Sequence, residues 1–402
     1  MTKVIIIGCG VAGPTLAIFL KRLGFEPVIY ERAKEFADAG LSLFLQPNGL
    51  KILSFLPGLF AAIPGKDIVS MSSYSTLAED EGLLGDNDVP ADVRDAFGYP
   101  MRGVRRTELL RLLVNTADVQ GIPIHWDHRL IDIEQTDGGV KAIFANGFID
   151  TGTFLVGCDG LHSVTRTVLF GEGPITFLGL TQTGGISPTP SDMVDHPHVI
   201  NWCGNGAHMM AYPISDTHTS WAITLREGEA RESWRAVDQH EVDKIKSTPI
   251  AKWGFGASGL IETAEKVVKF GLYDRPGLSS WHKGRIVLLG DAAHPTPPHL
   301  GQGANQSFED IYHLARLFGA HPGAAEDSAI LETVFTEYER ARIPRSTMLI
   351  DTAQKQGENR VVEGVQACLA RNQEVRAFMS NEEVVAMYAE LYGDLVAKRS
   401  TL

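Results

Sequence analysis

Blocks of apolar residues alternate with short glycine-rich breaks at the start of the chain. Residues 4–7 are an unbroken β-branched run, which is typical of a strand buried on both faces in a parallel sheet. Residues 14–23 place apolar side chains at helical spacing, and Gly24 provides a helix stop. Residues 27–32 form a second strand-like run. Together these segments predict a strand, a helix and a strand, a βαβ unit of about 30 residues.

The hydrophobic pattern changes several times further along. Residues 105–121 predict an amphipathic helix, and residues 122–160 predict several short strands. Between residues 174 and 270, apolar and polar positions alternate, which is typical of an antiparallel sheet. Residues 284–291 return to the buried-strand type, and the chain beyond residue 301 has mainly helical periodicity.

These changes predict an interleaved organisation. A chain of 402 residues is long enough for two or three domains, or for one large two-lobed α/β unit, and for a large core. We predict an α/β, Rossmann-like domain made of residues 1–173 and 276–345. An antiparallel-sheet domain of residues 174–275 is inserted into it, and residues 346–402 form C-terminal helices.

The charge balance narrows the possible partners. The chain has 36 Lys and Arg residues against 49 Asp and Glu residues, a formal net charge of −13. Nucleic-acid binding is therefore not expected, because no basic surplus is available to neutralise phosphates. The four cysteines are widely spaced, which favours reduced thiols in a cytoplasmic protein over disulfides or a zinc site. Since no apolar stretch reaches about 18 residues, we expect no membrane insertion.

Three glycines follow the first predicted strand. Gly8, Gly10 and Gly13 form a Gly-x-Gly-x-x-Gly pattern at the start of the predicted helix. Glycine there permits a tight turn and close approach of a pyrophosphate, which the helix N-terminus attracts. Glu31, 18 residues after Gly13, can accept hydrogen bonds from an adenosine ribose and disfavours a 2′-phosphate. The pattern predicts dinucleotide binding, and it fits NAD and FAD equally.

Two further motifs distinguish these cofactors. Asp159 and Gly160 end one predicted strand, and Asp291 ends another. The carboxylate of Asp291 has the chemistry to bind the hydroxyls of a ribityl chain. Residues 301–305 then open a helix whose N–H groups are suited to a pyrophosphate or a flavin ring. The combination favours FAD, because an NAD dehydrogenase needs neither motif. No second Gly-x-Gly-x-x-Gly is present, which predicts transient binding of NADH or NADPH.

In order and spacing, these motifs resemble the single-component FAD-dependent aromatic hydroxylases, the group of para-hydroxybenzoate hydroxylase and salicylate hydroxylase. The resemblance covers about residues 1–350. It implies the GR2-type flavoprotein hydroxylase fold, with FAD in the discontinuous domain and the substrate at the inserted sheet. By position it assigns cofactor binding to Gly8, Gly10, Ala12, Gly13, Glu31, Arg32, Arg106, Leu130, Asp159, Asp291, Pro298, Gly301, Gln302, Gly303, Ala304 and Asn305.

The same resemblance implies a reaction. NADH or NADPH reduces the bound FAD, and O2 then forms a flavin C4a-hydroperoxide that transfers oxygen to a small aromatic or heteroaromatic substrate. The cofactor does the difficult chemistry, while the protein orients the substrate and excludes water. The expected partner is a small molecule, and the protein is expected to be a monomer or a homodimer.

Three residues are candidates for substrate contact or for a catalytic base. His208 and Tyr212 are four residues apart in a predicted strand and therefore share one face of the sheet. Their spacing resembles the substrate-contacting His and Tyr of some pyridine and benzoate hydroxylases. His299 lies in a Pro-Pro-His turn that is expected to line the flavin site. Ordinary packing of a histidine beside a tyrosine would produce the same pattern, and no metal site is predicted.

Other functions remain compatible with the sequence. Within the same family, an epoxidase or an enzyme that modifies an antibiotic or other secondary metabolite would share these motifs. An FAD-dependent reductase or oxidase would use the cofactor without oxygen transfer. A flavin-binding protein that lost catalysis would keep the cofactor motifs alone.

Overall fold

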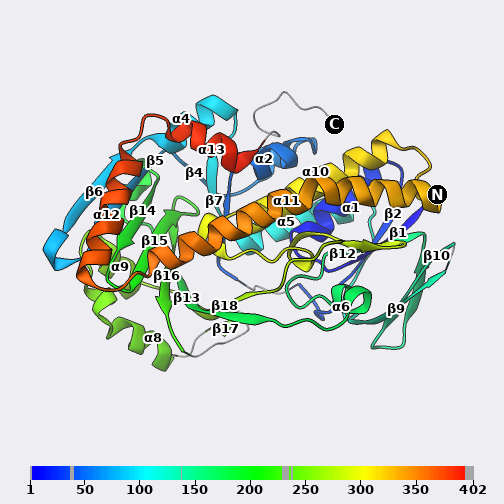
Figure 1. The fold of residues 1–402 in the computed structure, drawn as a ribbon, viewed down its shortest axis with the longest axis horizontal. Helices are drawn as coiled ribbons and strands as arrows, with labels where there is room; N and C mark the ends of the chain where they lie inside the picture. Colours follow the sequence, from blue (N-terminus) through cyan, green and yellow to red (C-terminus); the bar gives the residue numbers. More distant parts are fainter. Residues whose placement is uncertain (1, 37–39, 137, 229–234, 237–238, 394–402) are drawn as a thin grey trace.

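The computed structural model describes residues 2–36, 40–136, 138–228, 235–236 and 239–393. Its elements form two sheet-centred halves, which lie at the right and left of Figure 1, and one long helix crosses from one half to the other. The right-hand half contains the N-terminus and the predicted βαβ unit. We call it the cofactor half and the other the substrate half, after the roles predicted for them.

The cofactor half is built on a six-stranded sheet in the order β19-β20-β12-β1-β2-β8. Neighbouring strands are parallel except for β19 and β20. The strands are β1 (Lys3–Ile7), β2 (Glu26–Tyr30), β8 (Ile124–His125), β12 (Phe154–Gly157), β19 (His282–Lys283) and β20 (Ile286–Leu288). The predicted βαβ unit is therefore confirmed, and a strand from far along the chain completes the sheet beside β12.

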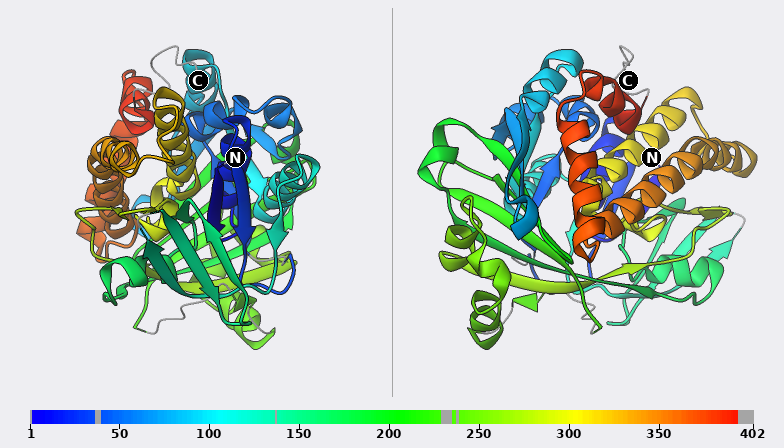
Figure 2. Two further views of the ribbon diagram at one scale, coloured as in Figure 1. Left: turned by 90° about the vertical axis from the view of Figure 1, so that its right-hand side faces the viewer. Right: turned by 60° about the vertical axis from the view of Figure 1, so that its left-hand side comes forward.

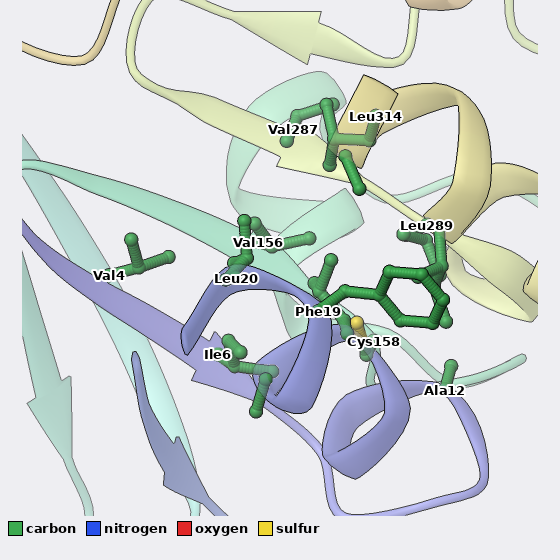
Figure 3. Packing of buried hydrophobic residues seen from close by; sticks show 14 of the residues in the cluster. Val4, Ile6, Ala12, Phe19, Leu20, Val156, Cys158, Val287, Leu289 and Leu314 are labelled. Carbon is green, nitrogen blue, oxygen red and sulfur yellow. The ribbon is translucent and has the colours of Figure 1, made fainter. Parts of the chain in front are cut away.

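Helices cover this sheet closely. Val4, Ile5 and Ile6 have no exposed surface, so both faces of β1 are covered, as its β-branched run predicts. Figure 3 shows Phe19 and Leu20 of α1 (Ala12–Arg22) in the same cluster as Leu314 of α10 (Gly303–Ala320). The remaining elements of this half are α5 (Arg106–Val119), α6 (Val164–Phe170), β9 (Leu130–Thr136), β10 (Gly139–Phe144) and β11 (Ile149–Gly152).

The substrate half is built on an eight-stranded sheet in the order β17-β18-β13-β16-β15-β14-β5-β6. Its strands are β5 (Ser70–Ser75), β6 (Gly82–Asn87), β13 (Thr176–Pro188), β14 (His198–Cys203), β15 (Ala207–Pro213), β16 (His218–Arg226), β17 (Arg235–Ala236) and β18 (Lys266–Asp274). The alternating pattern of residues 174–270 is thus antiparallel sheet. Strands β5 and β6 come from residues 70–87, so this sheet also recruits an earlier stretch; the predicted domain boundaries stay a prediction.

A small sheet joins the halves. It contains β3 (Ser42–Leu45), β4 (Lys66–Ile68) and β7 (Met101–Arg105) in the order β3-β7-β4. A Cβ on Gly103 would lie 2.2 Å from the carbonyl oxygen of Pro213, so glycine allows β7 to lie directly against β15. The remaining short elements are α2 (Pro47–Ser54), α3 (Leu59–Ala62), η1 (Ala78–Asp80), α4 (Val89–Phe97), α7 (Ser191–Asp195), α8 (Gln239–Lys246), η2 (Pro249–Lys252), α9 (Ala257–Glu262), η3 (Gly290–Ala292) and η4 (Pro298–Leu300).

The C-terminal part is helical, with α11 (Ser328–Arg360), α12 (Val365–Met379) and α13 (Val384–Tyr392). In Figure 2, α11 and α12 lie on one side of the eight-stranded sheet, and α8 and α9 lie on the other. Arg342 of α11 is fully buried and pairs with Glu309 and Asp310 of α10 at 2.5 and 2.7 Å. The end of α11 reaches the substrate half, where the amide of Gly206 donates to the carbonyl of Val362 at 2.9 Å. No helix in the described part of the chain is long and apolar enough to span a membrane.

Candidate cofactor and substrate site

The turn between β1 and α1 needs two of its three glycines for its own packing. A Cβ on Gly8, which has φ +104°, would lie 2.4 Å from the carbonyl oxygen of Cys158. A Cβ on Gly13 would lie 2.0 Å from the carbonyl oxygen of Gly8. A Cβ on Gly10 would meet no atom of the described chain within 4 Å, and Gly10 has no positive φ. The fold therefore requires Gly8 and Gly13, while Gly10 leaves space where a ligand can approach the backbone.

The acidic residue at the end of β2 is held in place by the same turn. One carboxylate oxygen of Glu31 accepts from the amide of Cys9 at 2.7 Å, and the other accepts from the amide of Ala33 at 2.9 Å. These bonds orient Glu31 beside the turn but leave lone pairs for a further donor. Arg32 is exposed, and Leu130 is buried at the start of β9. Their predicted roles in cofactor binding stay predictions.

The side chain of Asp291 is accessible to solvent, yet surrounding protein atoms desolvate it. Its side chain is solvent-accessible, and no hydrogen-bond donor of the described residues contacts its carboxylate. Desolvation nevertheless raises the pKa of this carboxyl, while the charges of His294 and Arg106 oppose the rise. Both observations hold if Asp291 lines a hollow that protein atoms surround. A carboxylate there, without a protein donor, fits a ligand that supplies hydroxyl groups.

The N-terminus of α10 opens beside Asp291. A Cβ on Gly303 would meet only the Oδ1 atom of Asp291, at 3.9 Å, so the fold does not itself require glycine at this position. Gly301, Gly303 and Ala304 are partly accessible, and no side chain caps the helix. Like the start of α1, which also lacks a side-chain cap, this end presents backbone N–H groups to an anion. The donors and spaces present in this half therefore fit FAD.

Two residues predicted to bind the cofactor use their side chains for packing. The amide of Gln302 donates to Gln46 at 2.8 Å and accepts from Asn48 at 2.9 Å. The amide of Asn305 donates to the carbonyls of Phe44 and Gly301 at 3.0 and 2.7 Å. These bonds fasten β3 and α2 to the start of α10. Only the backbone of these residues remains for the predicted cofactor contact.

Asp159, in the predicted motif of Asp159 and Gly160, also uses its side chain to hold neighbouring elements in place. The carboxylate of Asp159 accepts from the hydroxyl of Ser163 at 2.5 Å and from the amide and hydroxyl of Thr165, both at 3.0 Å. The guanidinium of Arg166 donates to the carbonyl of Ala293, two residues after Asp291, at 3.1 Å. Asp159 therefore shapes the start of α6, and α6 then holds the loop that carries Asp291.

The predicted substrate residues flank an accessible strip in the eight-stranded sheet. Asn201, Met210 and Ala222 lie side by side on β14, β15 and β16 and are partly exposed. His208 and Tyr212, two positions before and after Met210 on the same face, are both buried. Partly exposed side chains in the middle of a sheet, between buried neighbours, indicate that the described residues leave part of this strip uncovered. We call Asn201, Met210 and Ala222 the open strip.

The open strip runs across the strands, and along β15 Tyr212 lies on one side of it and His208 on the other. We call these sides its Tyr212 end and its His208 end, and they contact different elements. The hydroxyl of Tyr212 lies 2.8 Å from the hydroxyl of Ser42 in β3, and burial raises the Tyr212 pKa to about 12. Burial lowers the pKa of His208 well below its usual value, and the charges of Arg360, Arg371 and His299 lower it further. Both side chains are therefore neutral at pH 7, which suits hydrogen bonding to a substrate better than proton abstraction.

His299 lies at the His208 end of the open strip, on η4. Its ring is buried against Gly357 of α11, where a Cβ would lie 2.5 Å from its Nε2 and Cδ2 atoms. The guanidinium of Arg360 lies 3.4 Å from Nδ1 of His299. Arginine can only donate, so Nδ1 accepts and the proton of the neutral ring is on Nε2. Burial, with Arg360 adding to it, lowers the pKa of His299 to about 3, so the ring is neutral.

The structure thus brings together residues that are far apart in the sequence. His208, Tyr212 and His299 surround the open strip as candidates, and Ser42, Asn201, Met210 and Arg360 join them. Sequence reasoning missed these four. Ser42 and Arg360 belong to no sequence motif. Asn201 and Met210 are distinguished from the neighbouring strand residues by their partial exposure, which the sequence does not reveal. In the described residues, no group of acidic, histidine and cysteine side chains is arranged to hold a metal ion.

Comparisons with known proteins bear on the fold and on the cofactor. The family described as FAD binding domain matches residues 1–353. A 3-amino-4-hydroxybenzoate 2-monooxygenase from Streptomyces platensis is 34% identical over 352 residues, 85% of this chain and 84% of that protein. A 6-hydroxynicotinate 3-monooxygenase from Bordetella bronchiseptica is 28% identical, covering 79% of this chain and 82% of that protein. The crystal structure of Klebsiella pneumoniae HpxO with FAD and uric acid has the same fold, with a TM-score of 0.84, 24% identity and 98% coverage of both chains.

Proposed function

The chain belongs to the single-component FAD-dependent aromatic hydroxylases, and from this premise we propose where its reaction takes place. It is an FAD-dependent monooxygenase that uses NAD(P)H and O2 to hydroxylate a small aromatic substrate. We propose that the substrate ring lies on the open strip between His208 and Tyr212. The observation that carries this proposal is that Met210 is partly exposed on β15 between the buried side chains of His208 and Tyr212 on the same face.

When bound, FAD would supply the hydride-accepting and O2-activating chemistry, and the residues of the chain would hold it and shield it from water. In the proposed arrangement, the N-termini of α1 and α10 face its phosphates, Glu31 accepts from its ribose, and Asp291 accepts from its ribityl chain. Arg106 lies close enough to Asp291 for its charge to affect the carboxyl pKa. Asp159, Gln302 and Asn305 support this site by holding α6, β3 and α2 in position.

The substrate class follows from the relatives and from the neutral site. The named relatives act on hydroxylated benzoate and nicotinate rings, and we propose that this chain also acts on a ring that carries a hydroxyl group. His208 and Tyr212 then hydrogen-bond the substrate rather than remove its proton, because burial keeps both neutral. We also propose that the enzyme works as a monomer or homodimer in the cytoplasm, which four buried thiols without a disulfide support.

The test is NAD(P)H oxidation by the FAD-loaded protein, stimulated by a panel of hydroxylated benzoates and hydroxypyridines under labelled O2. We expect at least one compound to stimulate oxidation and to gain one labelled oxygen atom. His208→Gln and Tyr212→Phe should weaken this stimulation and leave FAD bound. Stimulated oxidation that yields only hydrogen peroxide with every compound would instead support an oxidase. If both variants match the unmodified enzyme, the substrate does not lie on the open strip.

A further inference from the structure

One buried cation beside the open strip has no acidic partner among the described residues. Arg360 is the last residue of α11, and only 9% of its surface is exposed. In the described part of the chain, no carboxylate lies within ion-pair distance of its guanidinium, and its Nε has no hydrogen-bond partner. The remaining contact joins one Nη atom to His299 at 3.4 Å. By contrast, Arg342 in the same helix is fully buried and pairs with two carboxylates.

The surroundings of Arg360 add no negative charge. The neighbouring Arg371 is also buried, and its guanidinium donates to the carbonyl of Gly204 and to the side chain of Asn372, which are both uncharged. His208 and His299 are neutral, and burial raises the pKa of the nearby Cys203 thiol, so this thiol is also neutral at pH 7. The region at the His208 end of the open strip therefore carries unbalanced positive charge.

An unpaired buried cation is costly to the fold, because desolvation is not offset by a partner. Burial lowers the pKa of Arg360 to about 10, which still leaves the guanidinium charged at pH 7. Such a group is stable in a folded protein when a ligand completes its coordination. Resting on the proposed placement of the substrate, we infer that Arg360 binds a carboxylate on the substrate ring and selects aromatic acids over neutral aromatics.

The geometry also orients the ring. Arg360 and His299 lie at the His208 end of the open strip, whereas Tyr212 and Ser42 lie at the other end, beside β3 and the start of α10. An acid held by Arg360 therefore directs its opposite edge toward Tyr212 and the proposed flavin position. A planar guanidinium suits this task because its N–H groups match the two oxygens of a carboxylate.

The test compares matched acid and amide ligands. Binding of 4-hydroxybenzoate and 4-hydroxybenzamide, and of 6-hydroxynicotinate and 6-hydroxynicotinamide, is measured by calorimetry on the FAD-loaded protein. We expect each acid to bind about 30-fold more tightly than its amide, as expected for a buried charge pair. Arg360→Gln should abolish this preference, and Arg360→Lys should retain part of it. Arg226→Gln, an exposed arginine that pairs with Glu358 near the end of α11, is the control and should keep the preference.

Thermal unfolding without ligand separates recognition from structural support. If Arg360 serves a ligand, Arg360→Gln should leave Tm unchanged or raise it, because it removes an uncompensated buried charge. A lower Tm, or an acid preference that survives Arg360→Gln, would overturn the inference, as would equal binding of acids and amides by the unmodified protein. This measurement needs no ligand, so it tests the inference even if no panel compound binds.

The two proposals fail in different ways. If acids bind through Arg360 but no labelled oxygen reaches a product, the proposed function fails and the inference stands. If 4-methylphenol, which has no carboxylate, is hydroxylated as well as the acids and Arg360→Gln changes nothing, the inference fails and the proposed function stands.

Discussion

The two halves of the molecule prepare their sites in different ways. The cofactor half presents backbone: two helix N-termini without side-chain caps, and glycines that leave room for a ligand. The substrate half presents side chains from β3, β15, η4 and the end of α11, and nearly all of them are neutral. A site made of backbone N–H groups suits a ligand, such as FAD, whose phosphates are always present. A site made of side chains can differ between related proteins, so that one fold can bind different substrates. Variants that affect one half without the other test this division.

The largest expected effect comes from a pair of glycines in the cofactor half. Gly13→Ala places a Cβ 2.0 Å from a backbone oxygen, so the β1–α1 turn must shift, and we expect a loss of about 3 kcal/mol or more in unfolding free energy. Gly10→Ala meets nothing in the described chain, so the FAD-free protein should be as stable as the unmodified one. Its affinity for FAD should nevertheless fall at least about tenfold, because the added methyl group occupies the space for the pyrophosphate.

Denaturant unfolding of the FAD-free protein and fluorescence titration with FAD measure the two effects separately. Unchanged FAD affinity in Gly10→Ala would show that the turn is not the pyrophosphate site. Equal stability of Gly13→Ala and Gly10→Ala would contradict the steric argument.

A smaller effect is expected at Asp291. Asp291→Ala removes the carboxylate proposed to accept from the ribityl chain, so FAD affinity should fall about 10-fold to 100-fold, as for a lost hydrogen bond to a charged group. Asp118→Ala, which removes an exposed carboxylate near the end of α5, is the control, and its effect should stay below about threefold. Equilibrium dialysis against FAD measures both. Similar losses in the two variants would place the ribityl chain elsewhere.

Gly357→Ala should affect the substrate half alone. The new Cβ lies 2.5 Å from the ring of His299 and displaces it, although alanine itself favours a helix by about 1 kcal/mol. A displacement of about 1 Å beside a substrate can lower turnover as much as about 100-fold. We expect less hydroxylated product per NAD(P)H consumed, with FAD affinity unchanged. Gly319→Ala in α10 meets only Leu23, at 3.8 Å, and should leave the product yield unchanged.

The smallest expected effect is on the pH dependence of stability. A histidine in one half should contribute stability that is lost as pH falls, and a histidine in the other half should contribute stability that is lost as pH rises. In the substrate half, the pKa of His299 in the folded protein, about 3, is below its unfolded value of about 6.5. Between these two pKa values, His299 binds a proton in the unfolded chain but not in the folded protein. Its contribution to the unfolding free energy is therefore fully present above about pH 6.5 and is lost as pH falls. In the cofactor half, desolvation lowers the pKa of His282, but bonds to Glu339 and Glu332 outweigh it and the net pKa is raised. Its stabilisation is present at low pH and is lost as pH rises through the folded pKa.

Unfolding free energies at pH 7.5 and 5.5 check these signs. His299→Gln should reduce the acid-induced loss of stability by about 1 kcal/mol. His282→Gln should change stability more at pH 5.5 than at pH 7.5. The exposed His196→Gln is the control for loss of a histidine. An acid-induced loss that is unaltered in His299→Gln would mean that this ring is not held neutral.

Much of the cofactor half could be predicted because its determinants are local. The strand of residues 4–7 pairs with β2, Gly13 faces the carbonyl of Gly8, and Glu31 accepts from Cys9, all within about 30 residues. Gly8 is the exception, because the residue that leaves no room for a Cβ there is the distant Cys158. The prediction was less successful in separating backbone from side-chain roles. Gln302 and Asn305 stand where a cofactor contact is expected, but their side chains bind Gln46 and Phe44, more than 250 residues away in the sequence.

The sequence alone determined the class of fold, the FAD motifs and the family, because the β-branched strand, the glycine turn and Glu31 can be recognised from short stretches of residues. His208, Tyr212 and His299 were identifiable as candidates, but not their surroundings. Tertiary structure decided that Gly357 makes room for His299 and that β5 and β6 join the substrate sheet. It also decided that Arg360 lies beside η4 with no acid of the described residues paired to it. Such arrangements depend on packing between distant segments, and no local pattern encodes which charge will be left without a partner.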